Sequence, residues 1–112
     1  MKLPNVLLAI VEPGKIVDYI LNPAHPDNGG KARFFSSLGF GRNDWGPLAA
    51  ALRNVAESHP IAKSMASPHG RKYIVDGRIE TPCGKAPLVR TVWIVDLGLD
   101  RPRLVTAYPR DE

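Results

Sequence analysis

A histidine held between two prolines is the clearest candidate for chemistry in this chain. His25 lies two positions after Pro23 and directly before Pro26. Because proline has a fixed φ, the backbone around the imidazole has little freedom to lose on folding, and the ring can be placed accurately. An unperturbed histidine has a pKa of about 6.5, which suits a general base at neutral pH. The alternative is a structural histidine that caps a helix or hydrogen-bonds a carbonyl group.

The residues that follow His25 could bind an anion. Asn28, Gly29, Gly30 and Lys31 lead directly into an apolar run with helical spacing. Free backbone N–H groups, the positive end of a helix and an ammonium group could therefore converge on one phosphate-sized anion. The segment lacks the G-x-x-x-x-G-K-S/T spacing of a P-loop, so we predict no nucleoside triphosphate fold. The alternative is that the glycines only turn the chain.

Two strand-like runs near the C-terminus carry polar side chains that could line the same site. Arg90 and Thr91 are adjacent, so they point to opposite faces of their strand. Thr106 and Tyr108 share a face of the next strand, and we expect this face to lie beside Thr91. Threonine is also a common strand residue, so a structural role is the alternative.

A further polar group combines two cations with an aromatic ring. Arg71, Lys72 and Tyr73 are consecutive at the start of another strand-like run. The combination suits contacts to phosphates and bases, and it is also common on exposed strands. The whole chain has 15 Lys and Arg against 11 Asp and Glu, a net charge of +4 that favours anionic partners such as RNA. Solubility alone also explains such a charge.

Residue spacing argues against other chemistries. The three histidines and the single cysteine, Cys83, show no H-x-x-x-H or C-x-x-C pattern, so we expect no metal site and no cofactor. No G-x-S-x-G nucleophile motif is present. A single cysteine excludes an internal disulfide and agrees with a reducing compartment. We find no secretory signal and no apolar run of the roughly 18 residues that a membrane helix needs, so we expect a cytoplasmic protein without a membrane segment.

Helices in the first half of the chain must position His25 and Lys31. The apolar run from Val6 to Val11 predicts a short strand. Apolar residues then recur with helical spacing in three segments, and each segment is bounded by residues that begin or end helices. The predicted helices are 13–21 with Pro13 in the first turn, 31–38 before Gly39, and a third that is capped by Asn43 or Asp44 and ends at Pro60.

The second half of the chain predicts a sheet. Residues 61–70 show no consistent period and are interpreted as a loop. Alternating runs then predict an antiparallel meander of about four strands, with a turn at Asp76 and Gly77. Helices followed by strands indicate an α+β fold in which the helices pack on one face of the sheet, within a single domain over residues 1–112. The other face is then free for a ligand. The predicted strands are 71–75, 78–80, 88–95 and 103–108.

The chain resembles a bacterial family catalogued as domain of unknown function 6883. The resemblance spans nearly the whole chain and rests on several motifs. They are Lys15 and Tyr19; Leu21-Asn22-Pro23; His25-Pro26; Gly30, Lys31-Ala32 and Phe35; Leu38-Gly39-Phe40; Arg71-Lys72-Tyr73; the run 90–95; and the run 102–109. A more distant similarity, in element order and residue type, is to barnase-like, colicin-like and RelE-like ribonuclease toxins. In those toxins a histidine, basic residues and strand hydroxyls line an open sheet face.

The similarity to ribonucleases implies roles for the candidate residues. His25 would remove the proton of a ribose 2'-hydroxyl or protonate the leaving 5'-oxygen. Cationic side chains would stabilise the charge that develops on the phosphate, and strand hydroxyls would orient it. The cationic side chains would be Lys31 and Arg90, and the hydroxyls would be those of Thr91 and Thr106. Further contacts to the substrate would come from Asn28, Gly30, Arg71, Lys72, Tyr73 and Tyr108.

Two functions remain open on these grounds. The first is a metal-independent, toxin-like ribonuclease with RNA as substrate and a cognate antitoxin or immunity protein as partner. The second is a non-catalytic protein that binds a partner, such as an antitoxin, an immunity protein or an accessory module. Fold analogy alone does not choose between them, and the sequence assigns no oligomeric state.

Overall fold

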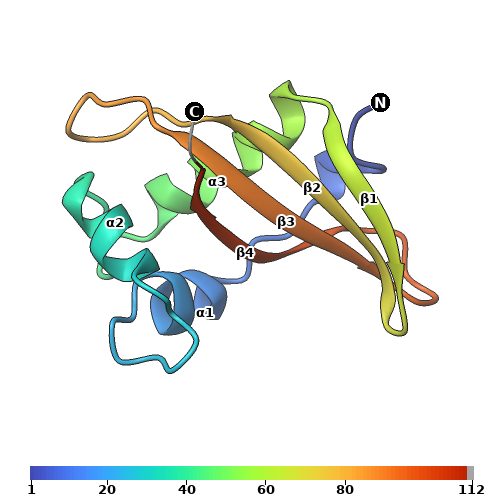
Figure 1. Cartoon of the computed structure of the whole chain (residues 1–112), viewed down its shortest axis with the longest axis horizontal. Helices are drawn as coiled ribbons and strands as arrows, with labels where there is room; N and C mark the ends of the chain where they lie inside the picture. The colour runs from blue at the N-terminus through green and yellow to red at the C-terminus, as the bar shows by residue number, and fades with distance from the viewer. Residues whose placement is uncertain (111–112) are drawn as a thin grey trace.

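The computed structural model describes residues 1–110, in which helical segments precede a sheet (Figure 1). A helix begins at Pro13 and continues through a π-helical turn, and two further helices follow it. The strands come after residue 60, so the predicted α+β class is confirmed. The elements are η1 (Val6–Leu8), α1 (Pro13–Lys15), η2 (Ile16–Ile20), α2 (Lys31–Ser37), α3 (Gly46–Ser58), β1 (Ile61–Ser67), β2 (Gly70–Arg78), β3 (Leu88–Asp96) and β4 (Arg103–Pro109).

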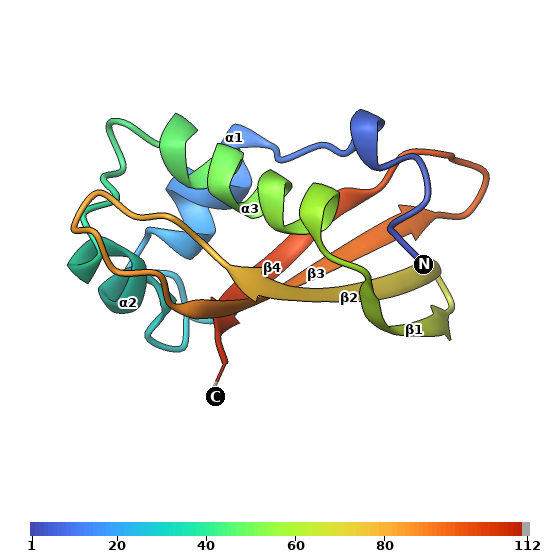
Figure 2. The same cartoon turned by 90° about the horizontal axis from the view of Figure 1, so that it is seen from above.

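The four strands form one antiparallel sheet in the order β1-β2-β3-β4. Helix α3 lies across one face of this sheet and contacts β2 and β3 (Figure 2). The shorter helices α1 and α2 contact β4, at one edge of the sheet. No helix within residues 1–110 is both long and apolar enough to cross a bilayer.

The hydrophobic core lies between α3 and the sheet. Leu48, Leu52 and Val55 recur at i, i+4 and i+7 of the helix, and all three are fully buried. On the sheet, Val75 and Trp93 are also fully buried and belong to the same cluster. The opposite face of the sheet, which we call the second face, therefore lies outside this core.

Three predicted elements differ from those observed. Residues 61–67, predicted as a loop, form the edge strand β1, whose side chains are mostly exposed and therefore show no apolar alternation. The run 6–11, predicted as a strand, contains the single turn η1 and one isolated parallel bridge between Ile10 and Arg103. Gly77, predicted to lie in a turn, sits within β2, where the ring of His59 occupies the space that a Cβ atom would need.

An irregularity in β4 sets which side chains reach the second face. Val92 pairs with Thr106, but Trp93 pairs with Leu104, so Val105 is an additional residue on β4. Leu104 consequently faces the core and is buried, whereas Thr106 faces the other side. The expectation of unbroken alternation through this strand is wrong, because a bulge restarts the period.

The bulge also corrects one predicted neighbourhood. Thr91 is aligned with Ala107 on the core face, and Arg90 is aligned with Tyr108 on the second face. Thr106 and Tyr108 therefore share a face with Arg90, not with Thr91 as expected. Of these two side chains, Tyr108 interacts with the guanidinium of Arg90, on the face that α3 leaves free.

Candidate functional site

Tyr19 is the centre of a polar cluster at the β4 edge of the sheet. Its side chain comes from η2, and its hydroxyl lies 3.0 Å from Oγ1 of Thr106 on β4. The ring of His25 meets the Tyr19 ring edge-on, with centroids 4.9 Å apart and an interplanar angle of 65°. The tyrosine thus joins the loop that carries His25 to the strand that carries Thr106.

Two lysine side chains approach the same aromatic ring. Nζ of Lys15 lies 5.3 Å from the Tyr19 ring centroid, and Nζ of Lys31 lies 5.4 Å from it. Both distances fall in the range in which a cation is attracted to the ring quadrupole. The two ammonium groups bring positive charge to one half-buried ring. We name Lys15, Tyr19, His25, Lys31 and Thr106 the Tyr19 cluster.

The loop that holds His25 is organised by Asn28, which is only 4% exposed. Its side-chain amide donates hydrogen bonds to the carbonyl oxygens of Tyr19, at 2.6 Å, and Ile20, at 3.1 Å. Its Oδ1 accepts the backbone N–H of Ala32 at 2.8 Å. Asn28 therefore ties the end of η2 to the start of α2. The predicted substrate contact through Asn28 does not fit, because its polar atoms are bonded to the protein itself.

The predicted anion site at the start of α2 also needs correction. The N–H group of Ala32 is occupied by Asn28, and the N–H group of Lys31 donates to the Asn28 carbonyl at 3.1 Å. Gly29 and Gly30 have φ values of 62° and 88°, a backbone conformation that favours glycine. These glycines turn the chain into α2. The N–H groups of Lys31 and Ala32 are thus already used within the protein. The ammonium of Lys31 donates to the Asn28 and Asp27 carbonyls at 3.1 and 3.5 Å, which leaves one of its three N–H groups for a ligand.

The imidazole of His25 is half-buried, and its orientation is set by a local hydrogen bond. The backbone N–H of Asp27 donates to Nδ1 at 3.1 Å. Because Nδ1 is an acceptor, the neutral ring carries its hydrogen on Nε2. In this arrangement His25 can donate a hydrogen bond from Nε2 to a ligand.

Two neighbouring cavities open at these residues. One has a volume of about 290 Å³ and is lined by Lys15, Tyr19, His25, Asp27, Val105 and Thr106. The other has a volume of about 440 Å³ and is lined by Gly29, Gly30, Lys31, Tyr108 and Pro109. Lys31 connects them, because its Nζ lies 5.4 Å from the Tyr19 ring centroid and 6.0 Å from that of Tyr108.

Arg90 reaches this region only through Tyr108. Its guanidinium forms a bidentate ion pair with Asp76, at 2.9 and 3.1 Å, and Nη1 of Arg110 binds the same carboxylate at 2.7 Å. The Asp76 carboxylate, with a smaller contribution from Tyr108, raises the pKa of Arg90 above its usual value. We name Asp76, Arg90 and Arg110 the Asp76 network. Arg90 is bound to this carboxylate and does not contact the Tyr19 ring.

Thr91 is a core residue. It is fully buried, its hydroxyl donates to the Val75 carbonyl at 2.7 Å, and it accepts the indole N–H of Trp93 at 2.8 Å. Both contacts satisfy buried polar groups of the protein. The prediction that Thr91 orients a phosphate does not fit a side chain without solvent access.

Arg71, Lys72 and Tyr73 lie elsewhere on the sheet. Tyr73 packs against the core, and Nη1 of Arg71 donates to Ser64 on β1 at 3.3 Å. Lys72 pairs with Ile94, four positions along β3 from Arg90. At about 3.3 Å per residue, Lys72 therefore lies about 13 Å along the sheet from the paired residues Asp76 and Arg90. The structure does not bring these three residues to the Tyr19 cluster.

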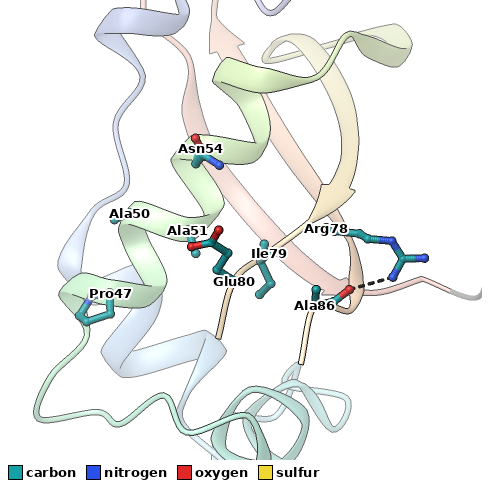
Figure 3. Close-up of a pocket in the computed structure, with 8 residues that line it drawn as sticks. All are labelled: Pro47, Ala50, Ala51, Asn54, Arg78, Ile79, Glu80 and Ala86. Carbon is teal, nitrogen blue, oxygen red and sulfur yellow. Dashed lines mark hydrogen bonds between the residues drawn. The ribbon is translucent and has the colours of Figure 1, made fainter. Parts of the chain in front are cut away.

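A larger cavity of about 650 Å³ lies between α3 and the residues that flank the connection from β2 to β3 (Figure 3). Arg78 points away from α3 and donates a hydrogen bond to the Ala86 carbonyl at 2.8 Å. Five of the eight lining residues are apolar, and the other three are Asn54, Arg78 and Glu80. A cation and a carboxylate therefore border this cavity, but none of the predicted site residues lines it. The lining residues are Pro47, Ala50, Ala51, Asn54, Arg78, Ile79, Glu80 and Ala86.

Two members of the Tyr19 cluster were not among the predicted site residues. Lys15 and Tyr19 stand at i and i+4, which places them on the same side of a helical segment. That spacing was the available signal, but tyrosine at a helical period equally indicates a core position. As for metals, no three His, Cys, Asp or Glu side chains gather into a potential ligand set within residues 1–110.

The fold and the site together define an α+β domain with a cationic cluster beside its edge strand. The chain belongs to the family described as Domain of unknown function (DUF6883), which matches residues 2–111. A similar solved chain comes from the contact-dependent growth inhibition toxin–immunity protein complex from Klebsiella pneumoniae 342. It aligns with a TM-score of 0.74 at 20% identity over 96% of this chain and 97% of that chain, which shows a shared fold. No curated protein matches the sequence significantly.

Proposed function

We propose that this protein is a metal-independent ribonuclease that acts at the Tyr19 cluster. The observation that carries the proposal is that His25, Lys31 and Thr106, from a loop, a helix and a strand, meet around Tyr19 beside an open cavity of about 290 Å³. RNA matches such a site, because it offers anionic oxygens to the ammonium groups and a hydroxyl beside each phosphate.

In the proposed reaction the ribose 2'-oxygen forms a bond to phosphorus, and the bond from phosphorus to the 5'-oxygen breaks. A base takes the proton of the 2'-hydroxyl, and an acid gives a proton to the 5'-oxygen. The products are a 2',3'-cyclic phosphate and a 5'-hydroxyl. Lys15 and Lys31 would stabilise the negative charge that grows on the phosphate, and one such preorganised group is typically worth about 10²–10³ in rate.

His25 would serve this reaction as acid or base at Nε2. As a base, Nε2 must accept a proton, so the hydrogen of the neutral ring must be on Nδ1. As an acid, the ring is doubly protonated and carries a hydrogen on both nitrogens. The hydrogen bond from the Asp27 N–H to Nδ1 must then open. The loop would therefore rearrange around His25 when substrate binds, since catalytic hydrogen bonds commonly tighten only in the substrate complex.

The likeness of fold supports a place in a toxin–immunity system, either as the toxin or as the immunity protein. The similar solved chain belongs to a complex between a growth inhibition toxin and its immunity protein. A small ribonuclease that arrests growth needs such a protective partner. The proposals that this protein binds RNA and cleaves its backbone depend on the Tyr19 cluster, so substitutions in that cluster test them.

The decisive experiment is cleavage of a defined RNA by purified wild-type protein and by His25→Ala. Removal of an acid or base typically costs about 10²–10⁴ in rate, so this variant should be nearly inactive while its unfolding transition stays cooperative. His69→Ala is the matched control, because His69 is exposed in the turn between β1 and β2 and should be dispensable. Equal rates for wild type and His25→Ala would remove the proposal.

The second candidate function is binding of a partner protein without catalysis. The cavity of about 650 Å³ beside α3 favours it, because small apolar side chains leave room there for a side chain of a partner. Induction in a bacterial host separates the two functions. Growth arrest that disappears with His25→Ala supports the enzyme, whereas harmless accumulation of the wild-type protein supports the binder.

A further inference from the structure

The cavity next to the Tyr19 cluster has the features of a slot for a planar group. Tyr108 and Pro109 form one part of its lining, and Gly29 and Gly30 form another. A Cβ atom built on Gly30 would meet no other atom within 4 Å, so the glycine backbone borders open space. The volume of about 440 Å³ lies within the usual range for sites of small organic ligands.

The Tyr108 side chain has cationic neighbours on two sides. Nζ of Lys31 lies 6.0 Å from the ring centroid, and Tyr108 pairs in register with Arg90, whose pKa it helps to raise. An aromatic side chain restrained in this way loses little further freedom when a second ring stacks on it. Stacking on tyrosine is a common way in which proteins hold unpaired bases.

Positive charge continues beyond this cavity. Arg90 and Arg110 share the single carboxylate of Asp76, so the Asp76 network carries a net charge of +1. The side chain of Arg110 is 47% exposed, and its backbone N–H binds the Leu88 carbonyl directly after Pro109. Arg110 thus follows the aromatic slot by one residue in the sequence, and its half-exposed guanidinium reaches Asp76 on β2, on the side away from the Tyr19 cluster.

From this order of groups we propose that the cavity binds an unpaired nucleotide next to the scissile phosphate, with its base on Tyr108 and its outer phosphate at Arg110. The inference rests on the proposed ribonuclease function and specifies its substrate class as single-stranded RNA. Lys31 stands between the two cavities and contacts the phosphate that joins them. A base in a duplex is stacked on both sides and cannot enter the slot.

The test uses an RNA strand in which every 2'-hydroxyl is methylated, so that binding is measured without cleavage. Wild-type protein should bind the single strand more tightly than the same strand in a duplex. Tyr108→Leu should weaken single-strand binding about tenfold, as expected for the loss of one stacked base. Tyr108→Phe keeps the ring and should bind within about twofold of wild type. Thermal unfolding of each variant checks that the fold is retained.

The outcomes separate this inference from the ribonuclease proposal. If wild type cleaves unmodified RNA but Tyr108→Leu binds the methylated single strand as tightly as wild type does, the inference is overturned and the enzyme stands. Equal affinity for single strand and duplex also overturns it. If no RNA is cleaved but single-strand binding still depends on the Tyr108 ring, catalysis is wrong and the nucleotide site stands. Absence of binding and cleavage overturns both.

Discussion

The two faces of the sheet use the same side chain for different purposes. Thr91 is fully buried beneath α3, and both of its hydrogen bonds are to the protein, at 2.7 and 2.8 Å. Thr106 lies on the other face, where its hydroxyl meets the Tyr19 hydroxyl beside an open cavity. A threonine hydroxyl that completes a buried network stabilises the fold, whereas one at a cavity is available to a ligand.

The difference follows from what each face is packed against. An unpaired polar group in the core would cost about 1–3 kcal/mol, so the core admits Thr91 only with its partners. At the β4 edge Lys15, Tyr19 and Lys31 are only half-buried, so solvent and salt screen the two positive charges that lie close together there. The comparison predicts stability effects on the first face and activity effects on the second.

Lys31→Ala should have the largest effect among substitutions that contrast the two faces. If its ammonium stabilises the phosphate in the transition state, kcat should fall about 10²–10³-fold with little change in the free energy of unfolding. Arg33→Ala is the matched control, since Arg33 is an exposed cation on the same helix. Similar losses of RNA cleavage in both variants would mean that only general charge matters.

Asn28→Ala tests whether burial or location decides the effect of a substitution, because Asn28 is buried but lies in the loop that carries His25. We expect it to behave like a core residue. Three hydrogen bonds are lost, to Tyr19, Ile20 and Ala32. At about 1 kcal/mol each, the free energy of unfolding should drop by about 3 kcal/mol. Urea unfolding measures this, and the exposed Asn54→Ala should change it by less than about 0.5 kcal/mol.

The pair Thr91→Val and Thr106→Val tests the comparison directly. Thr91→Val leaves the Trp93 indole N–H buried without its acceptor, which should cost about 1–3 kcal/mol of unfolding free energy. Thr106→Val loses one part-buried hydrogen bond, to Tyr19, so it should cost no more than about 1 kcal/mol of unfolding free energy, but it should slow RNA cleavage. The distinction between the faces fails if both variants lose stability equally in chemical denaturation.

Asp96→Asn should have the smallest effect and concerns an ion pair at the far end of β3. Hydrogen bonds from Arg103 lower the pKa of Asp96 below its usual value of 3.8. A lowered folded-state pKa means that the ion pair stabilises the fold above pH 3.8 and that this contribution is lost as the pH falls through the lowered value. The stability difference between wild type and variant should therefore be constant near neutral pH and shrink below about pH 3.8. A difference that stays constant far into the acid range would contradict this assignment.

The helical half of the fold could be predicted well because its signals are local. Pro13 begins the first helix, Lys31 the second, and the apolar residues of α3 at i, i+4 and i+7 predict the face that packs on the sheet. The central position of β3 was also predictable, since Val92 to Val95 form a continuous apolar run. Each of these features depends on residues within about one or two turns of one another.

The features that escaped prediction depend on distant residues. The sequence around Gly77 is typical of a turn, but the ring of His59 fills the space over the glycine and the strand continues. The bulge at Val105 arises from pairing with β3 and moves Thr106 and Tyr108 to the face of Arg90. The roles of Asn28 and Thr91 likewise depend on partners in other elements, since Asn28 binds carbonyls 8 and 9 residues before it and Thr91 binds one 16 residues before it.

For this protein, periodicity, prolines and glycines were sufficient for the α+β class, for the position of α3 and for a constrained loop around His25. The predicted cap of α3 at Asn43 or Asp44 was wrong, because Trp45 precedes the helix and no side chain caps it. Those properties depend on short-range sterics and on the burial of apolar faces. The gathering of His25, Lys31 and Thr106 around Tyr19, and the separation of Arg90 and Thr91 from them, came from packing. Contacts between residues up to 87 positions apart set which polar groups are already bonded within the protein and which still face an open cavity.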